Sequence, residues 1–523
     1  MAESEKPQRS IKPPSYFDAA APILLLIVLV ILAQVLYDGD STSGPFQVAL
    51  ICCALFAAAV AWKNGHDLKD LGKNAVDGIS SAMGAIFILL AVGALIGTWS
   101  MAGTTATLTW LGIKFLNPSW FYLACLIICG LISLSIGSSW TTVGTIGVAL
   151  MAIAGALQLN PAIAAGAIIS GGYFGDKMSP LSDTTNLSPA IAGTDLYTHI
   201  RTMLVTTVPS ILIAAALFAF VGWRAEVDVT AFDPAPALKA LEDAFNISIW
   251  TLLPLFVVLL MAIRRVPAFV AIMAGALAGG VMAVILQPQI VIKFADDPNL
   301  SAPLAMLKGI WSAMAWGFTF ASGYPKIDDL VSRGGMVSML STVWLVMAAM
   351  SFGAIMDYTG MLRKLLEPMV KFATNAGRLM ISVGVTAIFL NIFAGDQYMA
   401  LVLPGTIFRK EFEKRNIAPQ MLSRQMEDTA TITSPLVPWN TCGAYMAATL
   451  GIATIAYFPY CFFNLINPIL SFIFDAIGYQ IKYLTEEKAA QAYPPEPEHV
   501  AQYGVAGYSV NQVVGEPVAN PNK

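Results

Sequence analysis

Charged residues are scarce in this chain: Asp, Glu, Lys and Arg together make up 12% of its 523 residues. Water-soluble domains of average composition carry about 25% charged residues, so the surface of this protein cannot be mainly aqueous. Hydrophobic residues supply 57% of the chain, and the mean hydropathy is +0.68. We therefore predict an integral membrane protein, with the lipid bilayer as its first partner.

Cysteine and histidine are scarce as well, with six and three residues. The cysteines lie in or beside apolar runs, without a CxxC pair or a neighbouring histidine, so we expect buried free thiols rather than disulfides or metal ligands. The net charge of -4 and the lack of a basic cluster argue against a nucleic-acid partner. The sequence also lacks a catalytic Ser/His/Asp arrangement and a phosphate-binding loop, which argues against an enzyme or an ATP-driven pump.

Long apolar runs are the main feature that is present. About 20 residues cross the hydrocarbon layer of a bilayer, and eight uninterrupted runs come near that length: 19–37, 46–62, 81–100, 202–222, 247–263, 266–286, 338–356 and 459–480. Four more runs are interrupted by polar residues: 119–157, 161–198, 379–408 and 418–456. The sequence predicts an all-α polytopic protein whose function concentrates in the four interrupted runs.

The charges of the connectors predict the topology, because Lys and Arg accumulate in cytoplasmic loops. Basic connectors include residues 63–73, 264–265, 363–378 and 409–415, whereas 38–44 and 226–243 are acidic or neutral. We expect both termini to be cytoplasmic in a plasma membrane of the bacterial inner-membrane type. The segments outside the two membrane halves would be a cytoplasmic tail at 1–18, an external linker at 224–246 and a disordered C-terminal tail at 484–523.

The same charge rule predicts two re-entrant hairpins on opposite faces of the membrane. Residues 379–408 are basic at both ends, and 119–157 begins and ends on the outer side. Their tips would be Ala394–Gln397 and Gly137–Trp140. The tip of the second hairpin, 379–408, would face the tip of the first, 119–157.

Two inverted repeats follow from this topology. The halves 19–223 and 247–483 each have five crossings and one hairpin, and an odd number of crossings inverts the second half, which places sites at the midplane between them. Residues 136–140 align with 394–398, and Pro161 with Pro419, at an offset of 258. After a three-residue gap, 179–181 aligns with 434–436 through a shared Ser-Pro-Leu.

The interruption within the broken helix 161–198 carries the richest chemistry. Backbone that leaves a helix at membrane depth must line a cavity or be covered by protein. Its oxygen-bearing side chains suit Na⁺ and similar hard cations, and they are Asp176, Ser179, Ser182, Asp183, Thr184 and Asn186. We place Na⁺ at Asp176 and Asp183, which would also exchange protons, so Na⁺ and H⁺ would compete for one site.

Lys177, beside Asp176, has two interpretations. It could pair with a carboxylate of the empty site and be released when the cation binds, or its long side chain could reach the membrane rim. The sequence leaves both open.

The broken helix 418–456 and the hairpin tips supply the remaining candidates. Glu427 or Asp428 could form a second cation or proton site, and Asp428 is preferred because it lies nearer the break. Arg424, on the same helical turn, could pair with them instead. Asn440 and Thr441 follow in the second break. At the tips, Ser138, Ser139, Thr142 and Asp396 could complete the site or simply cap turns.

Several of these motifs resemble the NhaC family of Na⁺/H⁺ antiporters. The resemblance is strongest at GGYFGDKMSPLSDTTNL, residues 171–187, and continues through 138–150, 332–336, 396–398, 427–428 and 434–443. It spans about residue 80 to 460. The resemblance implies a homodimer of inverted repeats with opposed hairpins that works by an elevator mechanism, and exchange of Na⁺, sometimes Li⁺, for H⁺ with no cofactor besides these coupling ions.

Two other functions stay open. Some relatives in this family exchange malate and lactate with Na⁺ and H⁺, so small carboxylates are a second substrate class. Such a substrate needs a cationic anchor, and only Lys177 and Arg424 lie near the breaks. An ion channel is a third hypothesis, but a channel has no need of carboxylates at mid-membrane depth.

Overall fold

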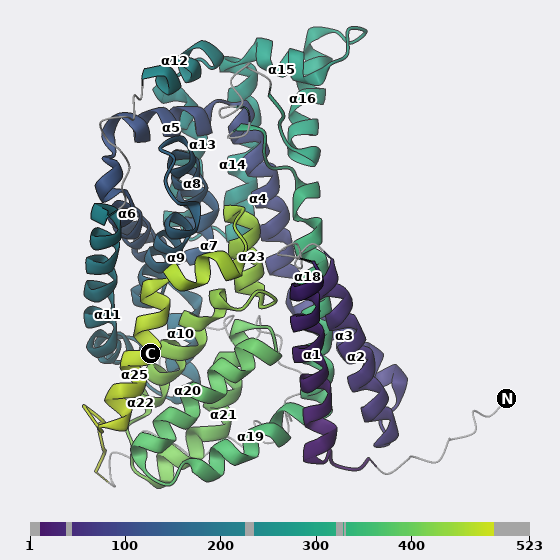
Figure 1. Ribbon diagram of the computed structural model, residues 1–523, viewed down its shortest axis with the longest axis vertical. Coiled ribbons are helices and arrows are strands. Elements are labelled where there is room, and N and C mark those ends of the chain that lie inside the picture. The colour runs from purple at the N-terminus through teal and green to yellow at the C-terminus, as the bar shows by residue number, and fades with distance from the viewer. Residues whose placement is uncertain (1–10, 38–43, 225–234, 321–327, 329–330, 486–523) are drawn as a thin grey trace, which may run out of the picture.

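The computed structural model of the chain describes residues 11–37, 44–224, 235–320, 328 and 331–485 (Figure 1). Within these ranges the fold is all helical, and the only β-pairing is an isolated bridge between Ile417 and Tyr483. The predicted all-α class is therefore confirmed. Most of the two predicted terminal tails, and part of the external linker, lie outside the described residues.

Nine helices among the described residues are long and apolar enough to cross a membrane, or up to eleven if two sharply bent pairs each count as one span. The predicted uninterrupted runs correspond to the following helices: α1 (Tyr16–Leu36), α2 (Pro45–Lys63), α4 (Met83–Met101), α11 (Leu196–Arg224), α13 (Leu253–Ile263), α14 (Ala268–Leu286), α18 (Leu340–Tyr358) and α25 (Phe462–Ala476). Their lipid-compatible composition and length explain why hydropathy finds them.

Other helices lie in segments that the sequence left as connectors: α3 (Leu68–Ser81), α5 (Thr104–Phe115), α12 (Ala235–Ala244), α15 (Pro288–Ala295), α16 (Ala302–Trp316) and α19 (Met361–Phe372). Most are too short to cross alone, and α3 and α19 carry several charges. A search for apolar runs of about 20 residues therefore does not find these helices.

The interrupted runs fold as pairs of helices around short breaks. In the first hairpin, α6 (Phe121–Ile136) is followed by α7 (Ser139–Thr142), the π-helical turn η3 (Val143–Gly147) and α8 (Val148–Ala156). In the second, α20 (Ala376–Phe393) is followed by α21 (Gln397–Lys414). The segments Pro118–Ile136, Ser139–Ala156 and Ala376–Phe393 are each 18 or 19 residues long.

The two broken helices are built in the same way. The first consists of α9 (Pro161–Met178) and α10 (Asp183–Ala192). The second consists of α22 (Pro419–Met426), the π-helical turn η6 (Glu427–Thr431), the 3₁₀ turn η7 (Ser434–Leu436) and α23 (Thr441–Leu450). The chain then continues as the short helix α24 (Thr454–Tyr457) and α25.

Helix boundaries recur along the chain at a nearly constant spacing. The pairs α4 and α18, with 19 residues each, and α5 and α19, with 12 each, are offset by 257 residues, as from Met83 to Leu340. From α9 onward the spacing is 258: α9 and α22 begin at Pro161 and Pro419, and the left-handed caps of α10 and α23 are Gly193 and Gly451. The second half thus repeats several helix lengths and boundaries of the first.

The matched helices α5 and α19 lie at opposite ends of the molecule's long axis (Figure 1). The first follows α4 and the second follows α18, which are matched in length. α4 therefore leads to one end of the molecule and α18 to the other (Figure 1).

Candidate functional site

The break between α9 and α10 spans Ser179 to Ser182. Pro180 cannot donate a backbone hydrogen bond, so the helical ladder cannot continue through it. The chain restarts where the Ser182 side chain accepts from the Thr185 amide as the N-cap of α10. The break therefore separates the predicted cation ligands Asp176, at the end of α9, and Asp183, at the start of α10.

The tip of the first hairpin packs directly on this break. Gly137 turns the chain with a φ of 77°, and a Cβ there would lie 2.6 Å from the Leu181 carbonyl carbon and 2.7 Å from the Ser182 nitrogen. Only glycine permits both the left-handed conformation and this close approach. The Ser138 side chain accepts from the Thr141 amide and caps α7.

Asp176 is the point where the tip meets α9. Ser139 donates to one carboxylate oxygen, Oδ2, from both its amide (3.0 Å) and its hydroxyl (2.6 Å). The other oxygen, Oδ1, is buried and has no hydrogen-bond partner among the described residues. Asp176 is 6% exposed. A buried carboxylate oxygen without a donor is a position suited to a cation or a proton.

Asp183 has a different environment, because it is exposed. One of its oxygens accepts from the Thr184 amide at 3.0 Å, and the other accepts from the hydroxyl of Tyr398, in α21. The second hairpin therefore contacts the first broken helix through this bond. The two carboxylates placed together by sequence reasoning lie on the same break, but only Asp176 is buried.

Glu427 is fully buried and is held by hydroxyl groups of the first broken helix. Thr184 donates to Oε1 at 3.0 Å, and Ser188 donates to Oε2 at 2.5 Å. Ser182 in turn lies 3.1 Å from the Thr184 hydroxyl. Glu427 belongs to the π-helical turn η6, and such turns are frequent at functional sites. Among the described residues, Glu427 forms no ion pair.

Lys177 pairs with Asp428, and both side chains are fully buried. This position excludes the interpretation in which Lys177 reaches the membrane rim. The lysine also donates to Asn467 at 3.1 Å, and the aspartate accepts from Thr206 at 3.0 Å and from Ser471 at 2.9 Å. The pair joins α9 to η6 and is supported by side chains from α11 and α25.

Arg424 extends this pair into a network of two cations and two carboxylates. Its Nε lies 3.7 Å from Asp428 Oδ2, which is the local contact considered from the sequence, and its Nη2 donates to Asp475 at 2.5 Å. All of these side chains are fully buried. A buried charge requires such compensation, so the network leaves Asp176 and Glu427 as buried carboxylates outside it.

The second break has helix caps at the same positions as the first, but its other contacts differ. The Asp396 side chain accepts from the Met399 amide and caps α21, and it lies 3.5 Å from the Thr441 hydroxyl. The Thr441 amide donates to the Gly395 carbonyl at 2.9 Å. Asn440 caps α23 and donates to Asn391 at 3.1 Å.

Two hydrogen bonds recur at the spacing of 258 residues. Ser133 Oγ donates to the Gly172 carbonyl at 2.6 Å, and Asn391 Nδ2 donates to the Ala430 carbonyl at 2.6 Å. Ser139 and Asp176 have as counterparts Gln397 and Ser434, which are hydrogen bonded at 2.7 Å. The position of Asp176 is therefore occupied by a serine in the second half.

The remaining predicted residues serve mainly local structure. Ser179 accepts from the Leu181 amide, and Thr142 donates to the Ser138 carbonyl. Asn186 is exposed and donates to the Pro180 and Ser182 carbonyls, which stabilises the break.

Sequence reasoning missed several residues that contact the site: Ser188, Thr206, Tyr398, Asn467 and Asp475. From the sequence, His199 is considered only for a pH-sensing role. His199 is buried, and its Nδ1 lies 2.5 Å from the hydroxyl of Ser423. A signal existed for Asp475, since it is a lone carboxylate in the apolar run 459–480, and such residues are functional candidates by default. Ser188 lies in α10 itself, but its partner Glu427 is in the other half. Thr206, Tyr398 and Asn467 belong to helices outside the two broken ones.

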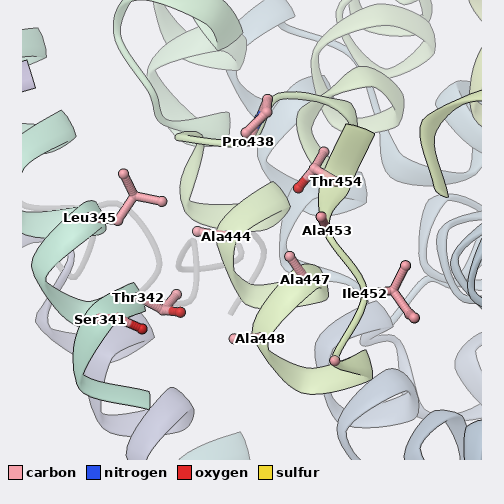
Figure 2. A pocket seen from close by; sticks show the side chains of 11 residues that line it. Ser341, Thr342, Leu345, Pro438, Ala444, Ala447, Ala448, Ile452, Ala453 and Thr454 are labelled. Atoms are coloured by element: carbon pink, nitrogen blue, oxygen red, sulfur yellow. The ribbon is translucent and has the colours of Figure 1, made fainter. Parts of the chain in front are cut away.

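A cavity of about 200 Å³ lies beside the second break, between α18 and α23. Figure 2 shows Ser341, Thr342 and Leu345 of α18 on one side and Ala444, Ala447 and Ala448 of α23 on the other. Pro438 of the break also lines it. The lining is uncharged, so this cavity has no group that could neutralise a charged substrate.

Comparison with known proteins identifies related sequences over most of the chain. The model of the Na⁺/H⁺ antiporter family matches residues 1–173 and 171–479. The chain is 37% identical to the Na⁺/H⁺ antiporter NhaC of Alkalihalophilus pseudofirmus over 460 residues, which cover 88% of this chain and 96% of that protein. It is 36% identical to the NhaC antiporter of Bacillus subtilis over 82% of this chain and 91% of that protein.

A relative with a different stated cargo is nearly as similar. The malate-2H⁺/Na⁺-lactate antiporter of Bacillus subtilis is 34% identical over 470 residues, which cover 89% of this chain and 97% of that protein. The comparisons therefore point to antiporters as a group.

Proposed function

The chain belongs to the Na⁺/H⁺ antiporter family, and on that premise we propose that it is a secondary antiporter that exchanges cytoplasmic Na⁺ for H⁺, with Li⁺ as a second candidate ion. The observation that carries the proposal is Asp176. It is a buried carboxylate at a helix break, with one oxygen held by Ser139 and the other without a partner among the described residues.

Asp176 is the proposed point of competition between the two ions. Na⁺ favours oxygen ligands, and the free Oδ1 together with the hydroxyls and carbonyls of the break supplies them. When Asp176 holds a proton, that oxygen is no longer an anionic ligand. Loading with one ion therefore requires release of the other, which is the chemical basis of exchange.

Glu427 is the proposed second exchange site. It is buried among the hydroxyls of Thr184 and Ser188, without a cation partner among the described residues. A carboxylate in such surroundings is stable as a neutral acid or with a bound cation. Because Thr184 follows Asp183 directly, a change at Glu427 would reach the first break through one hydrogen bond.

Lys177 and Asp428 are proposed to balance each other's charge while the cation site is empty. They belong with Arg424 and Asp475 to a network of two cations and two carboxylates. Entry of Na⁺ near Asp176 would weaken the hold of Lys177, its neighbour in sequence, on Asp428. Lys177 would then act by charge compensation.

The architecture is proposed to be two inverted repeats with opposed re-entrant hairpins, at 119–157 and 379–408, that move as an elevator in a homodimer of the inner membrane. Matched helix lengths and matched hydrogen bonds support the repeat, and the opposite positions of α5 and α19 support its inversion (Figure 1). Both termini are proposed to be cytoplasmic, because placing the connectors rich in Lys and Arg in the cytoplasm puts both ends of the chain on that side.

A Na⁺-coupled exchanger of malate and lactate is the second candidate, because one relative is named for that activity. Such a substrate needs a cation that is not already neutralised. Lys177 is paired with Asp428, and Arg424 is paired with Asp475. The pairing of both buried cations near the breaks favours the inorganic exchange.

The test is transport by the purified chain in liposomes with an imposed Na⁺ gradient and a pH-sensitive dye inside. Movement of protons driven by Na⁺ alone is the expected result. The same liposomes are then assayed with malate and with lactate. Strict dependence on an organic acid would exclude the Na⁺/H⁺ antiporter in favour of the second candidate, and passive Na⁺ flux without proton movement would indicate a channel.

A further inference from the structure

The two hairpin tips each carry an aromatic residue at the same place, and each of these residues contacts the opposite half. Trp140 and Tyr398 are 258 residues apart, in α7 and α21. The Trp140 ring stacks on Tyr445 of α23 with centroids 4.0 Å apart and an interplanar angle of 13°, and the Tyr445 hydroxyl donates to the Trp140 carbonyl at 2.8 Å. Tyr398 donates to Asp183 of α10. Each tip is thus fastened to the other half's broken helix.

The chemistry of these two contacts differs. Tyr445 reaches a backbone carbonyl, whereas Tyr398 reaches a carboxylate. The counterpart of Asp183 in the second half is Thr441, which carries no charge and contacts its own tip at Asp396. Only the first broken helix therefore presents a carboxylate held by the aromatic residue of the opposite tip.

Both oxygens of Asp183 accept hydrogen bonds in this state, one from the Thr184 amide and one from Tyr398. Asp183 forms no ion pair among the described residues, and it is exposed, whereas Asp176 across the break is buried. The phenol hydrogen bond holds the carboxylate of Asp183 toward the second hairpin tip, so a cation at the break would compete with Tyr398 for it. A hydrogen bond to a charged group is stronger than a neutral one and competes with the cation.

We propose that Tyr398 is a positioning residue that sets the Na⁺ affinity of the antiporter, by holding Asp183 outside the coordination sphere of a cation bound at Asp176 until the second hairpin tip moves. The inference rests on the proposed function. The second half has Ser434 at the position of Asp176. Through Tyr398 it would nevertheless take part in loading the cation site of the first half.

The test is Tyr398→Phe, which removes the hydroxyl and keeps the ring. The apparent dissociation constant for Na⁺, measured as radioactive Na⁺ retained by the purified protein, is expected to fall about tenfold, the value of one charge-assisted hydrogen bond. Tyr445→Phe is the matched control, because it removes the hydroxyl that fastens the other tip without touching a carboxylate. Its Na⁺ affinity is expected to be unchanged.

A double-mutant cycle separates positioning from a general structural effect. In an Asp183→Asn background, where Na⁺ binding is weaker but present, Tyr398→Phe is expected to change the dissociation constant by less than about twofold, since a hydrogen bond that no longer involves a charge contributes little to the competition. An equal change in both backgrounds would overturn the proposal. So would an unchanged or weaker affinity in Tyr398→Phe alone, or a complete loss of Na⁺ binding in Asp183→Asn, which would make Asp183 a permanent ligand.

An incorrect antiporter assignment and an incorrect role for Tyr398 give different results. If the unaltered protein binds Na⁺ but moves no protons in liposomes, the antiporter assignment is wrong, whatever the Tyr398 variant does. If the unaltered protein exchanges Na⁺ for H⁺ and the affinity of Tyr398→Phe stays the same, only the role of Tyr398 is wrong.

Discussion

Lys177 and Asp428 form an ion pair in which neither side chain is exposed, although 251 residues separate them along the chain. The pair ties the end of α9 to the π-helical turn η6, and Asn467 contacts both members. It therefore fastens the charged part of the first broken helix to the second.

Lys177→Ala is expected to lower the free energy of unfolding by about 3 to 5 kcal/mol, because it leaves the buried Asp428 without its closest cation. It should also change the Na⁺ affinity and the pH dependence of exchange. Thermal unfolding of the purified protein and transport in liposomes measure the two effects. Combining it with Asp428→Asn should recover much of the stability, and an unchanged transport profile in the single variant would remove the lysine from the mechanism.

Asp176→Asn is expected to reduce Na⁺-driven proton movement to the level of empty liposomes, since an amide neither exchanges a proton nor supplies an anionic ligand. The control is Ser434→Ala at the matched position of the second half, which removes the hydroxyl that bonds Gln397 but no charge. That variant should keep coupled exchange. Persistent exchange in Asp176→Asn would move the coupled site elsewhere.

Gly137→Ala is expected to be the most damaging of three alanine substitutions at left-handed glycines. Alanine costs about 1 kcal/mol or more at each position because of the backbone conformation. Of the three, Gly137 alone would bring the new Cβ within 3 Å of backbone atoms, at 2.6 Å and 2.7 Å. At Gly395 its nearest neighbours would be 3.4 Å away, and at Gly451 no described atom lies within 4 Å. Unfolding temperatures of the three variants, followed by transport, test this order.

Asp475→Asn is expected to destabilise the protein by about 3 kcal/mol, because Arg424 loses the carboxylate 2.5 Å from its Nη2 in a fully buried position. The matched control is Asp297→Asn, which breaks a partly exposed pair between Asp297, in the connector after α15, and Lys308 of α16. That pair should be worth less than about 1 kcal/mol. Equal unfolding temperatures for the two variants would show that the buried network adds no stability.

The sequence predicts the fold well where the solvent determines it. Apolar runs of about 20 residues identify the spans because lipid imposes their length, and the all-helical class is confirmed on the described residues. Helices such as α5 and α16 are missed, since neither reaches that length. The re-entrant form of the hairpins stays a prediction, because arms such as Ala376–Phe393 are long enough to cross.

The site is predicted only in part, because its contacts depend on tertiary packing. The breaks at Pro180 and Pro435 are local properties and can be found from sequence. The partner of Lys177 cannot, since it lies in the other half. The three-residue gap in the predicted repeat also illustrates the limit: the helix caps keep a spacing of 258, which pairs Ser434 with Asp176 rather than with Ser179.

The hydrogen bond from Ser139 to Asp176 and the one from Ser434 to Gln397 occupy the same place in two copies of one scaffold. A duplicated backbone can therefore keep its geometry while one copy loses its ionisable group. In evolutionary terms, the second copy is free to change its chemistry as long as its shape still fits. The two halves therefore share a backbone arrangement but differ in charge at this position, where the first half carries Asp176 and the second carries the uncharged Ser434.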